Sequence, residues 1–429
     1  MKVLKFKNLR SAAIIFSLVG LCFSAHAQKA IKKEVILEKV KAVENYVKDV
    51  RGYLHEHPEL SSKEFETARF IQGELEKIGL PVTKVEGTGF YAILDTKKAG
   101  KTIGLRTDID ALPVPENAEN LKQPKKWISK VEGVSHACGH DGHIAILLGA
   151  VKVLNELKGS LSGRIVFIFE EAEETGEGID KMVNALKPLN IDAFYGNHLS
   201  AAMKTGDFFI IDGPMMAGSS IVAFDVIGRG GHGSRPDLSI NPIFAAADIL
   251  SGISIAWNNQ RDITQTLTLG ITQIHGGEAN NVIPNSVFIG GTVRFFDKAE
   301  AERGLGTIKK VAENIAAAHN CTVKIREETR IMLTPVINDK QLAELGQKAV
   351  GALYPGKVDT SKENIWFASE TFSKYSTLAP ALFVFVGIQN DDLGSGAAHH
   401  NDRFDIDEDA LPYAVGGMVG FAVEYLNAK

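Results

Sequence analysis

The feature that most constrains the fold is the alternation of short apolar runs with longer stretches of helical periodicity. Apolar runs of strand length occur at 103–105, 165–169, 194–195 and 382–386. Between them, stretches such as 144–154 repeat apolar residues three and four positions apart, which is the spacing of one helix face. Strands that alternate with helices are typical of a sheet covered by helices. The pattern therefore predicts an α/β domain.

The pattern changes in the middle of the chain. The order expected there is strand 221–227, helix 242–257, strands 267–274 and 287–295, helix 299–318 and strand 322–326. A chain of 429 residues also exceeds what one hydrophobic core usually serves. We therefore expect a larger α/β domain made of 28–214 and 333–429, interrupted by a compact α+β unit formed by 215–332.

The first 27 residues have the pattern of a secretory signal peptide. MKVLKFKNLR is positively charged, and Ala25-His26-Ala27 has the small-x-small form of a cleavage site. The apolar run between them is shorter than the roughly 20 residues that span a bilayer, which disfavours the alternative of a membrane anchor and a stable span. We expect cleavage before Gln28 and a secreted or periplasmic protein.

Charge excludes one class of partner, and the cysteines leave a question open. A formal net charge of -5, with no basic patch, gives no reason to expect binding to nucleic acid. After cleavage only Cys138 and Cys321 remain. In a secreted chain these two could pair as a disulfide, unless one of them has another role.

The densest polar cluster is SHACGHDGH (135–143), directly before a helical stretch. Cys138 and His140 stand two positions apart, and thiolate and imidazole are both good ligands for zinc-like divalent ions. A Cys-x-His pair alone is more often incidental than functional. Two further histidines and an aspartate stand beside this pair, and hydrophobic cores rarely gather so many ionisable groups at one turn. The cluster therefore favours a metal site.

A second cluster, FEEAEETGEG (169–178), follows an apolar run. Its carboxylates should emerge at the carboxyl end of a strand, where open α/β sheets place their ligand sites. Such acidic runs are usually solvated loops, but the apolar run before it and its glycines favour a tight turn. Glu173 and Glu174 could then divide the work, one binding metal and the other moving protons.

Histidines near two further motifs complete a set of candidate ligands. GNHL places His198 just after an expected strand, and AAHHNDRF offers His399 and His400 near the carboxyl terminus. A lone histidine is more often structural than a ligand. Taken together, however, the candidates suffice for two divalent ions: Cys138, His140, Glu174, His198 and His400.

Eight motifs in order carry a resemblance to a known family. They are RTDIDALP (106–113), SHACGHDGH, the AEE of FEEAEETGEG, GNHL, GRGGHGSRP (228–236), NVIP (281–284), GTVRFFD (291–297) and HNDRF (400–404). The set resembles the aminoacylase, hippurate-hydrolase and auxin-conjugate-hydrolase branch of the metallopeptidase family that includes carboxypeptidase G. The resemblance implies a metal-dependent amidohydrolase that cleaves the amide bond of a small N-acyl amino acid.

The resemblance also implies roles for particular residues. It makes the five candidate ligands the binding site for two divalent ions (Zn, Mn or Co) and Glu173 the general base. It implies an α/β catalytic domain interrupted by a smaller α+β lid domain that mediates dimerisation, so we expect a homodimer. Within the lid, His232 would polarise the substrate carbonyl, and Asn281 and Arg294 would hold the substrate carboxylate. His232 would act either on its own subunit or on its partner's.

Some positions depart from the pattern of this branch. Glu170-Glu171 stands where Gln-Pro is usual, which we expect to add negative charge beside the base. Thr371 follows Glu370 where an acidic residue is usual. Asp108 and Asp110 are expected to support the ligands without binding metal themselves.

Two other functions stay open at this point. A metallo-exopeptidase or dipeptidase would share every metal ligand and differ only in how its pocket receives the amino end of the substrate. A non-catalytic binding protein on the same scaffold would have no need of Glu173 or of a full ligand set.

Overall fold

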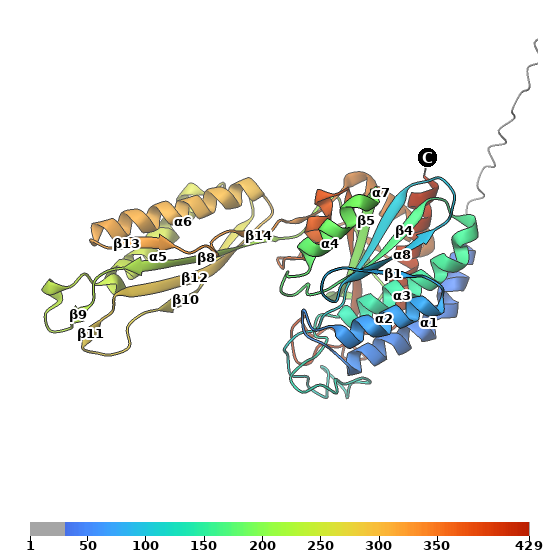
Figure 1. Cartoon of the computed structure of the whole chain (residues 1–429), viewed down its shortest axis with the longest axis horizontal. Coiled ribbons are helices and arrows are strands. Elements are labelled where there is room, and N and C mark those ends of the chain that lie inside the picture. The colour runs from blue at the N-terminus through green and yellow to red at the C-terminus, as the bar shows by residue number, and fades with distance from the viewer. Residues whose placement is uncertain (1–30, 429) are drawn as a thin grey trace, which may run out of the picture.

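The computed structural model describes residues 31–428, so the expected signal peptide lies outside the described residues. Most of the chain forms one large sheet with helices on both faces, and a second, smaller sheet projects from it (Figure 1). Among the described helices, none is long and apolar enough to cross a bilayer.

The large sheet has eight strands in the order β1-β2-β4-β3-β5-β17-β6-β16. The four central strands β4, β3, β5 and β17 are parallel. The strands are β1 Val82–Lys84, β2 Phe90–Asp95, β3 Thr102–Asp108, β4 Arg164–Glu170, β5 Ala193–Lys204, β6 Phe208–Phe209, β16 Val358–Asp359 and β17 Ala381–Gln389. Parallel strands covered on both faces read as continuous apolar runs, which is why the four central strands were visible in the sequence.

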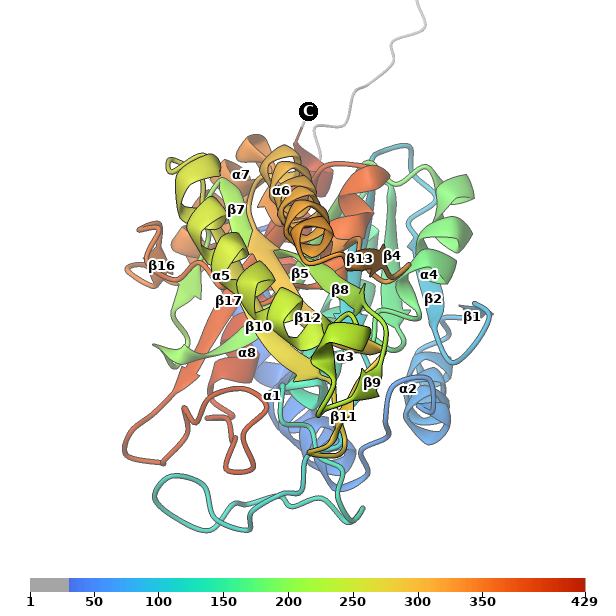
Figure 2. The same ribbon diagram turned by 90° about the vertical axis from the view of Figure 1, so that its left-hand side faces the viewer.

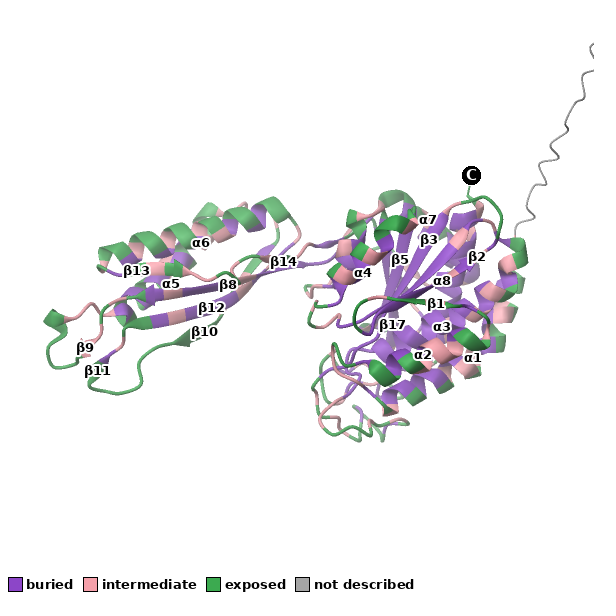
Figure 3. Cartoon of the chain, viewed as in Figure 1, coloured by how far each residue is buried: buried purple, intermediate pink, exposed green. Residues whose placement is uncertain are grey.

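Two hydrophobic cores lie on the two faces of this sheet. The larger core packs five helices on one face, namely α1 Lys33–Glu56, α2 Phe65–Lys77, α3 His140–Leu157, α7 Lys340–Leu353 and α8 Ala410–Asn427. The other face is covered by α4 Ile179–Leu186 and the 3₁₀ segment η4 Thr371–Thr377. The strands between them are buried over most of their length (Figure 3).

The second sheet has its own core and its own helices. Its strands are β8 Gly218–Ile227, β10 Leu267–His275, β12 Ser286–Phe295, β13 Thr322–Ile325 and β14 Ile331–Leu333. Helices α5 Pro242–Gln260 and α6 Lys298–Ala318 pack side by side on one face of it (Figure 2). We call this unit, together with the short strands β9 Gly231–His232 and β11 Val282–Ile283, the small domain.

The expected fold class is confirmed, since an α/β sheet domain is interrupted by a smaller α+β domain. The sequence did not indicate the short strands at the junction of the two domains. These are β7 Gly213–Met216 and β15 Val336–Asn338, which pair with each other, and β14, which pairs with β8. The remaining 3₁₀ segments are Lys158–Ser160, Lys187–Leu189 and Pro236–Leu238.

Candidate metal centre and active site

The candidate site lies at the carboxyl ends of the parallel strands. Asp108 ends β3, Glu170 ends β4, and His198 lies in β5 beyond the residues that pair with β3. Helix α3 begins at His140 beside the same edge. Because the carboxyl ends of parallel strands meet at one edge of a sheet, side chains that are distant in sequence converge there.

The five candidate ligands come together at this edge. The ligand atoms of Cys138, His140 and His198 lie within 4.8 Å of one another, as do those of Cys138, Glu174 and His400. Cys138 Sγ is 3.5 Å from His198 Nε2. Glu174 Oε1 is 3.7 Å from His140 Nε2 and 3.3 Å from His400 Nε2. Two overlapping groups that share a cysteine have the composition expected of two neighbouring metal positions.

Hydrogen bonds fix the two buried imidazoles in the form that binds metal. His140 Nδ1 donates to the carbonyl of Asp110 at 2.9 Å, and His198 Nδ1 donates to the carbonyl of Leu199 at 2.7 Å. Since a carbonyl can only accept, each Nδ1 carries a hydrogen, and Nε2 is the nitrogen left to bind metal. In the described structure, His140 Nε2 and Glu174 Oε1 are buried and have no hydrogen-bond partner. Buried orphan acceptors that point at one another fit a cation.

The electrostatic environment of the site is negative: although burial opposes it, the charge of Asp108 raises the pKa of His140 well above its ordinary value. Burial, and next the charge of Glu174, raises the pKa of the Cys138 thiol well above its ordinary value. Burial, and next the neighbouring His143, lowers the pKa of His198 well below its ordinary value. A bound divalent cation favours both the thiolate and the neutral imidazole. The residues present therefore fit the metal ions that the sequence implied.

Asp110 supports two of the candidate ligands at once. Its Oδ1 atom lies 3.2 Å from His140 Nδ1, while its Oδ2 atom accepts from the backbone N–H of Glu174 at 3.1 Å. Ser61 donates a further hydrogen bond to Oδ2 at 2.7 Å. Asp110 thus contacts the imidazole of His140 and the backbone of Glu174, which come from different elements.

Asp108 supports the site through His143. Its Oδ1 atom is 2.8 Å from His143 Nδ1, and His143 Nε2 accepts from the backbone N–H of Leu199 at 2.9 Å. The amide makes Nε2 the acceptor, so Nδ1 carries the hydrogen and donates to Asp108. Asp108, His140 and His143 also come close enough to hold an ion. Both nitrogens of His143 are used by these hydrogen bonds, which disfavours that alternative.

Glu173 lies beside the candidate ligands without belonging to either group around Cys138. One of its oxygens lies within 4.8 Å of ligand atoms of His140 and Glu174. Its Oε1 atom accepts from the backbone N–H of Thr371 at 3.1 Å. Burial, then the charges of Glu370 and Glu174, raises its pKa well above the ordinary value. A carboxylate of raised basicity next to a metal centre suits proton transfer.

The extra carboxylates before this motif are both partnered. Glu170 accepts from Arg106 Nε at 2.8 Å and from the hydroxyl of Tyr375 at 2.7 Å. Glu171 accepts from the hydroxyl of Thr88 at 2.7 Å and lies 3.4 Å from Lys181 Nζ. The expected excess of negative charge beside the base is therefore compensated by groups on other elements.

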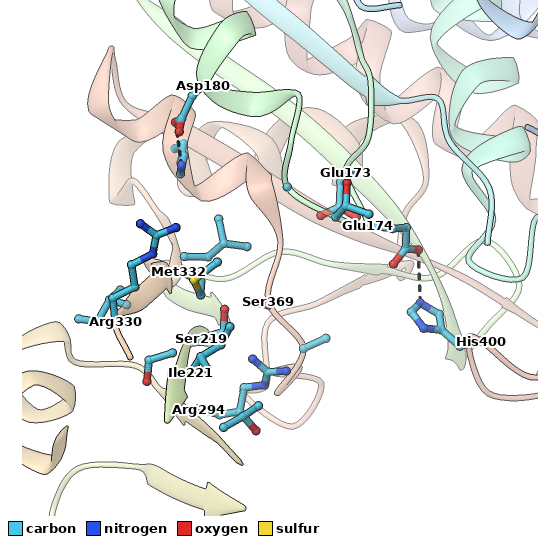
Figure 4. Close-up of a pocket in the computed structure, with 18 residues that line it drawn as sticks. Glu173, Glu174, Asp180, Ser219, Ile221, Arg294, Arg330, Met332, Ser369 and His400 are labelled. Atoms are coloured by element: carbon cyan, nitrogen blue, oxygen red, sulfur yellow. Dashed lines mark hydrogen bonds and ion pairs between the residues drawn. The ribbon is translucent and has the colours of Figure 1, made fainter. Parts of the chain in front are cut away.

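A groove of about 640 Å³ connects the metal centre with the small domain. Figure 4 shows Glu173, Glu174 and His400 on one side and Arg294 and Arg330, from the small domain, on the other. Arg294 is half-buried and, among the described residues, forms no ion pair; its burial lowers its pKa. A half-buried guanidinium without a counter-ion fits the carboxylate of a ligand.

Two of the expected site residues do not reach the metal centre of their own chain. His232 lies on β9, which pairs with β11, and the backbone carbonyl of Asn281 accepts from Gly233 N–H at 2.8 Å. His232 Nδ1 is 2.7 Å from the hydroxyl of Ser234. The β9–β11 pair lies at the end of the small domain that points away from the large sheet (Figure 1). Neither His232 nor Asn281 lines the groove.

Sequence reasoning missed several residues that support the site. Arg106 on β3 and Thr371 and Tyr375 on η4 meet Glu170 from two different elements, and nothing local in the sequence joins them. The disulfide that the sequence left open is absent, since Cys138 and Cys321 are both free and buried.

Fold and site together define a hydrolase of amide bonds that uses two divalent metal ions. Residues 104–424 match peptidase family M20/M25/M40, and the chain belongs to that family. It is 33% identical over 408 residues to IAA-amino acid hydrolase ILR1-like 4 of Arabidopsis thaliana, covering 94% of this chain and 91% of that protein. It is 35% identical over 334 residues to N-acyl-L-amino acid amidohydrolase of Geobacillus stearothermophilus, covering 76% and 88%.

A solved structure agrees in fold. The YXEP protein of Bacillus subtilis, described as a dinuclear metal-binding peptidase of the M20 family, superposes with a TM-score of 0.76 at 30% identity. The match covers 91% of this chain and all of that one (100%). In this chain, the two overlapping groups of candidate ligands around Cys138 could likewise hold two divalent ions.

Metal affinity should depend on Asp110 although it binds no metal. Replacing Asp110 by Ala keeps the carbonyl that accepts from His140 but removes the carboxylate beside that imidazole and the acceptor for the Glu174 N–H, so we expect affinity for zinc to fall by about 10- to 100-fold. Competition with a chromophoric chelator measures this. Asp192→Ala is the control, because that carboxylate also accepts a backbone hydrogen bond, from Thr102, but at the opposite end of β3. Equal affinities in wild type and Asp110→Ala would contradict the assignment.

Proposed function

We propose that this chain hydrolyses the amide bond of N-acyl amino acids. The observation that carries the proposal is the groove in which Glu173 and the candidate metal ligands face an uncompensated Arg294. Such a groove places a carboxylate on one side and the scissile amide on the other. The names of two similar proteins, an N-acyl-L-amino acid amidohydrolase and an IAA-amino acid hydrolase, support the same substrate class.

The residues divide the reaction among them. Two divalent ions held by Cys138, His140, Glu174, His198 and His400 would make a water molecule more acidic and polarise the amide carbonyl. Glu173 takes the proton from that water as it attacks the carbonyl, and later delivers a proton to the leaving amine nitrogen. Arg294 binds the substrate carboxylate. Asn281 lies beside His232 at the β9–β11 pair, so it would join Arg294 only if it comes from a partner subunit. His232 donates a hydrogen bond to the oxygen on which negative charge develops.

The charges in the groove favour an acylated over a free amino group. A dipeptidase needs a carboxylate for the α-ammonium group of its substrate. Among the described residues that line the groove, the acidic ones are Glu173, Glu174 and Asp180. Asp180 is paired with Lys374 at 2.7 Å, and the two glutamates serve the metal centre. The dipeptidase alternative therefore lacks a partner for its substrate, and a non-catalytic protein would not need Glu173.

A substrate panel tests this proposal. The metal-free protein is assayed against N-acyl amino acids and free dipeptides, each with added zinc, manganese or cobalt. We expect hydrolysis of the N-acyl compounds, dependent on metal, with kcat/KM higher than for the matching dipeptides. A preference for dipeptides would favour the exopeptidase alternative, and no turnover with any metal would leave only the binding protein.

Substitutions of the two adjacent glutamates should have different effects. In Glu173→Gln, kcat should fall by about two to four orders of magnitude with the metal still bound, because the amide keeps the shape but accepts no proton. In Glu174→Gln, metal content should fall instead. Elemental analysis and steady-state kinetics on both variants measure this. The assignment fails if the two variants exchange these behaviours.

We also propose a homodimer in which His232 reaches the metal centre of the partner subunit. Within each chain, β9 and β11 lie far from the groove, so His232 cannot act at its own centre in this arrangement. Strand β10 is the edge of the small sheet and is largely exposed, as are Phe244 and Ile255 on α5. An unpaired edge strand beside an apolar helix face supports pairing with a second copy. The alternative is a hinge closure within one chain.

A mixing experiment separates these two arrangements. Glu173→Gln and His232→Ala are each expected to be nearly inactive. In a reassorted mixture half of the dimers are mixed, and half of the sites in those dimers keep both residues, so activity should recover to about a quarter of wild type. Subunit exchange is confirmed independently by native mass spectrometry. Exchange without recovered activity would place His232 at its own subunit's centre or outside catalysis.

The expected secretion remains a proposal as well. It rests on the charged start, the short apolar run and Ala25-His26-Ala27, none of which lies in the described part of the chain. The mass of the mature protein checks it. A chain that begins at Gln28 and is recovered from outside the cytoplasm would support it, and an uncleaved cytoplasmic chain would refute it.

A further inference from the structure

One fully buried arginine, Arg106, forms hydrogen bonds with several side chains close to Glu173. Arg106 donates from Nε to Glu170 at 2.8 Å and from Nη1 to Asp108 at 2.9 Å. Its Nη2 atom donates to the hydroxyl of Thr371 at 2.9 Å and lies 3.1 Å from Glu370 Oε1. A planar guanidinium presents its donors in fixed directions, so the groups around it have fixed positions too.

Thr371 lies between this arginine and Glu170. Its hydroxyl has one hydrogen, and the closest acceptor is Glu170 Oε1 at 2.6 Å. Because Arg106 can only donate, the Thr371 oxygen accepts from Arg106 and donates to Glu170. The hydroxyl thus accepts one hydrogen bond and donates another, and together these two bonds orient the side chain.

The backbone of the same residue holds Glu173. The N–H of Thr371 donates to Glu173 Oε1 at 3.1 Å. In the described structure this is the one hydrogen bond that the side chain of Glu173 receives, although the carboxylate is partly buried beside Glu174 and Glu370. The direction of the Glu173 carboxylate therefore depends on where the Thr371 backbone lies.

We propose that Glu170 and Thr371 are positioning residues for catalysis. Their contact fixes the Thr371 backbone, which keeps Glu173 Oε1 occupied and turns the other oxygen toward the metal centre. Neither residue is among the groove-lining residues or the candidate metal ligands, so their effect passes through Glu173. This inference rests on the proposed role of Glu173 as general base.

Moving the carboxylate from position 170 to position 371 should have a smaller effect on activity than either substitution alone. Thr371→Asp alone puts a second carboxylate against Glu170, at a contact of 2.6 Å, and like charges so close destabilise each other. Glu170→Gln alone removes one of the carboxylates that balance Arg106. The double variant Glu170→Gln/Thr371→Asp keeps the number of charges and moves one carboxylate across the contact. It should therefore be more active than either single variant.

The first test removes only the hydroxyl. In Thr371→Val we expect kcat to fall by about 10- to 100-fold, since a small displacement of a catalytic group has effects of that size. KM and metal content should change by less than about twofold, because Thr371 contacts neither substrate nor metal. Thr371→Ser should restore most of kcat. The control is Thr102→Val, which removes another buried hydroxyl that accepts from an arginine, at the far end of β3, and should keep kcat.

The second test is the exchange cycle, measured as kcat for the two single variants and the double variant. Recovery in the double variant supports the proposal. A Thr371→Val protein that is folded and keeps wild-type kcat, or a double variant worse than both singles, overturns it. Glu173→Gln is measured in parallel. If that variant is active, the proposed base is wrong; if it is inactive while Thr371→Val is normal, the positioning inference alone is wrong.

Discussion

The structure depends on one constraint, which is that potential metal-binding atoms of several buried side chains converge on one enclosed space. His140 and His198 are each tied by Nδ1 to a carbonyl, so their Nε2 lone pairs must face the same interior as Cys138 and Glu174. His140 Nε2 and Glu174 Oε1 have no hydrogen-bond partner, and leaving such atoms unpaired in a protein interior costs on the order of 1–3 kcal/mol per group. Divalent ions remove that cost and add the Lewis acidity that amide hydrolysis needs. Without metal, the unpaired buried atoms destabilise the fold. With metal, the same atoms would hold the ions that promote amide hydrolysis.

Hydrogen bonds from surrounding residues fix the positions of the candidate ligands. Asp110 joins His140 to the backbone of Glu174, and His143 joins Asp108 to β5, the strand that carries His198. On the far side of helix α3, the fully buried Arg51 donates to Asp141 at 2.9 Å, and His55 lies 2.7 Å from the same carboxylate. Removing one partner of such a buried pair typically costs about 3–5 kcal/mol. The start of α3 is thus held to α1 directly behind the candidate ligands.

The sequence predicted what is local and missed what is assembled over long distances. Strands β3, β4 and β17 and helix α3 were visible because each is an uninterrupted apolar run or a regular period. Cys138 and Glu174 were visible because each stands in a cluster of ionisable groups just after or before such an element. The contact between Arg106 and Thr371 spans 265 positions, and its partners lie on a strand and a 3₁₀ segment that meet only in the fold. No period or motif could therefore indicate it. The two departures at Glu170 and Thr371 looked independent in the sequence, yet the structure places them 2.6 Å apart.

The small domain explains why one chain can hold the metal centre but lack part of the proposed catalytic set. Arg294 lies on β12 close to the junction and reaches the groove, whereas His232 lies at the opposite end of the same domain. All five candidate metal ligands come together within one chain. Anomalous diffraction from crystals of the zinc-loaded protein tests it most directly. We predict two peaks per chain, about 3.5–4 Å apart, bounded by Cys138, His140, Glu174, His198 and His400. A single peak, or a peak between Asp108 and His143, would contradict the account.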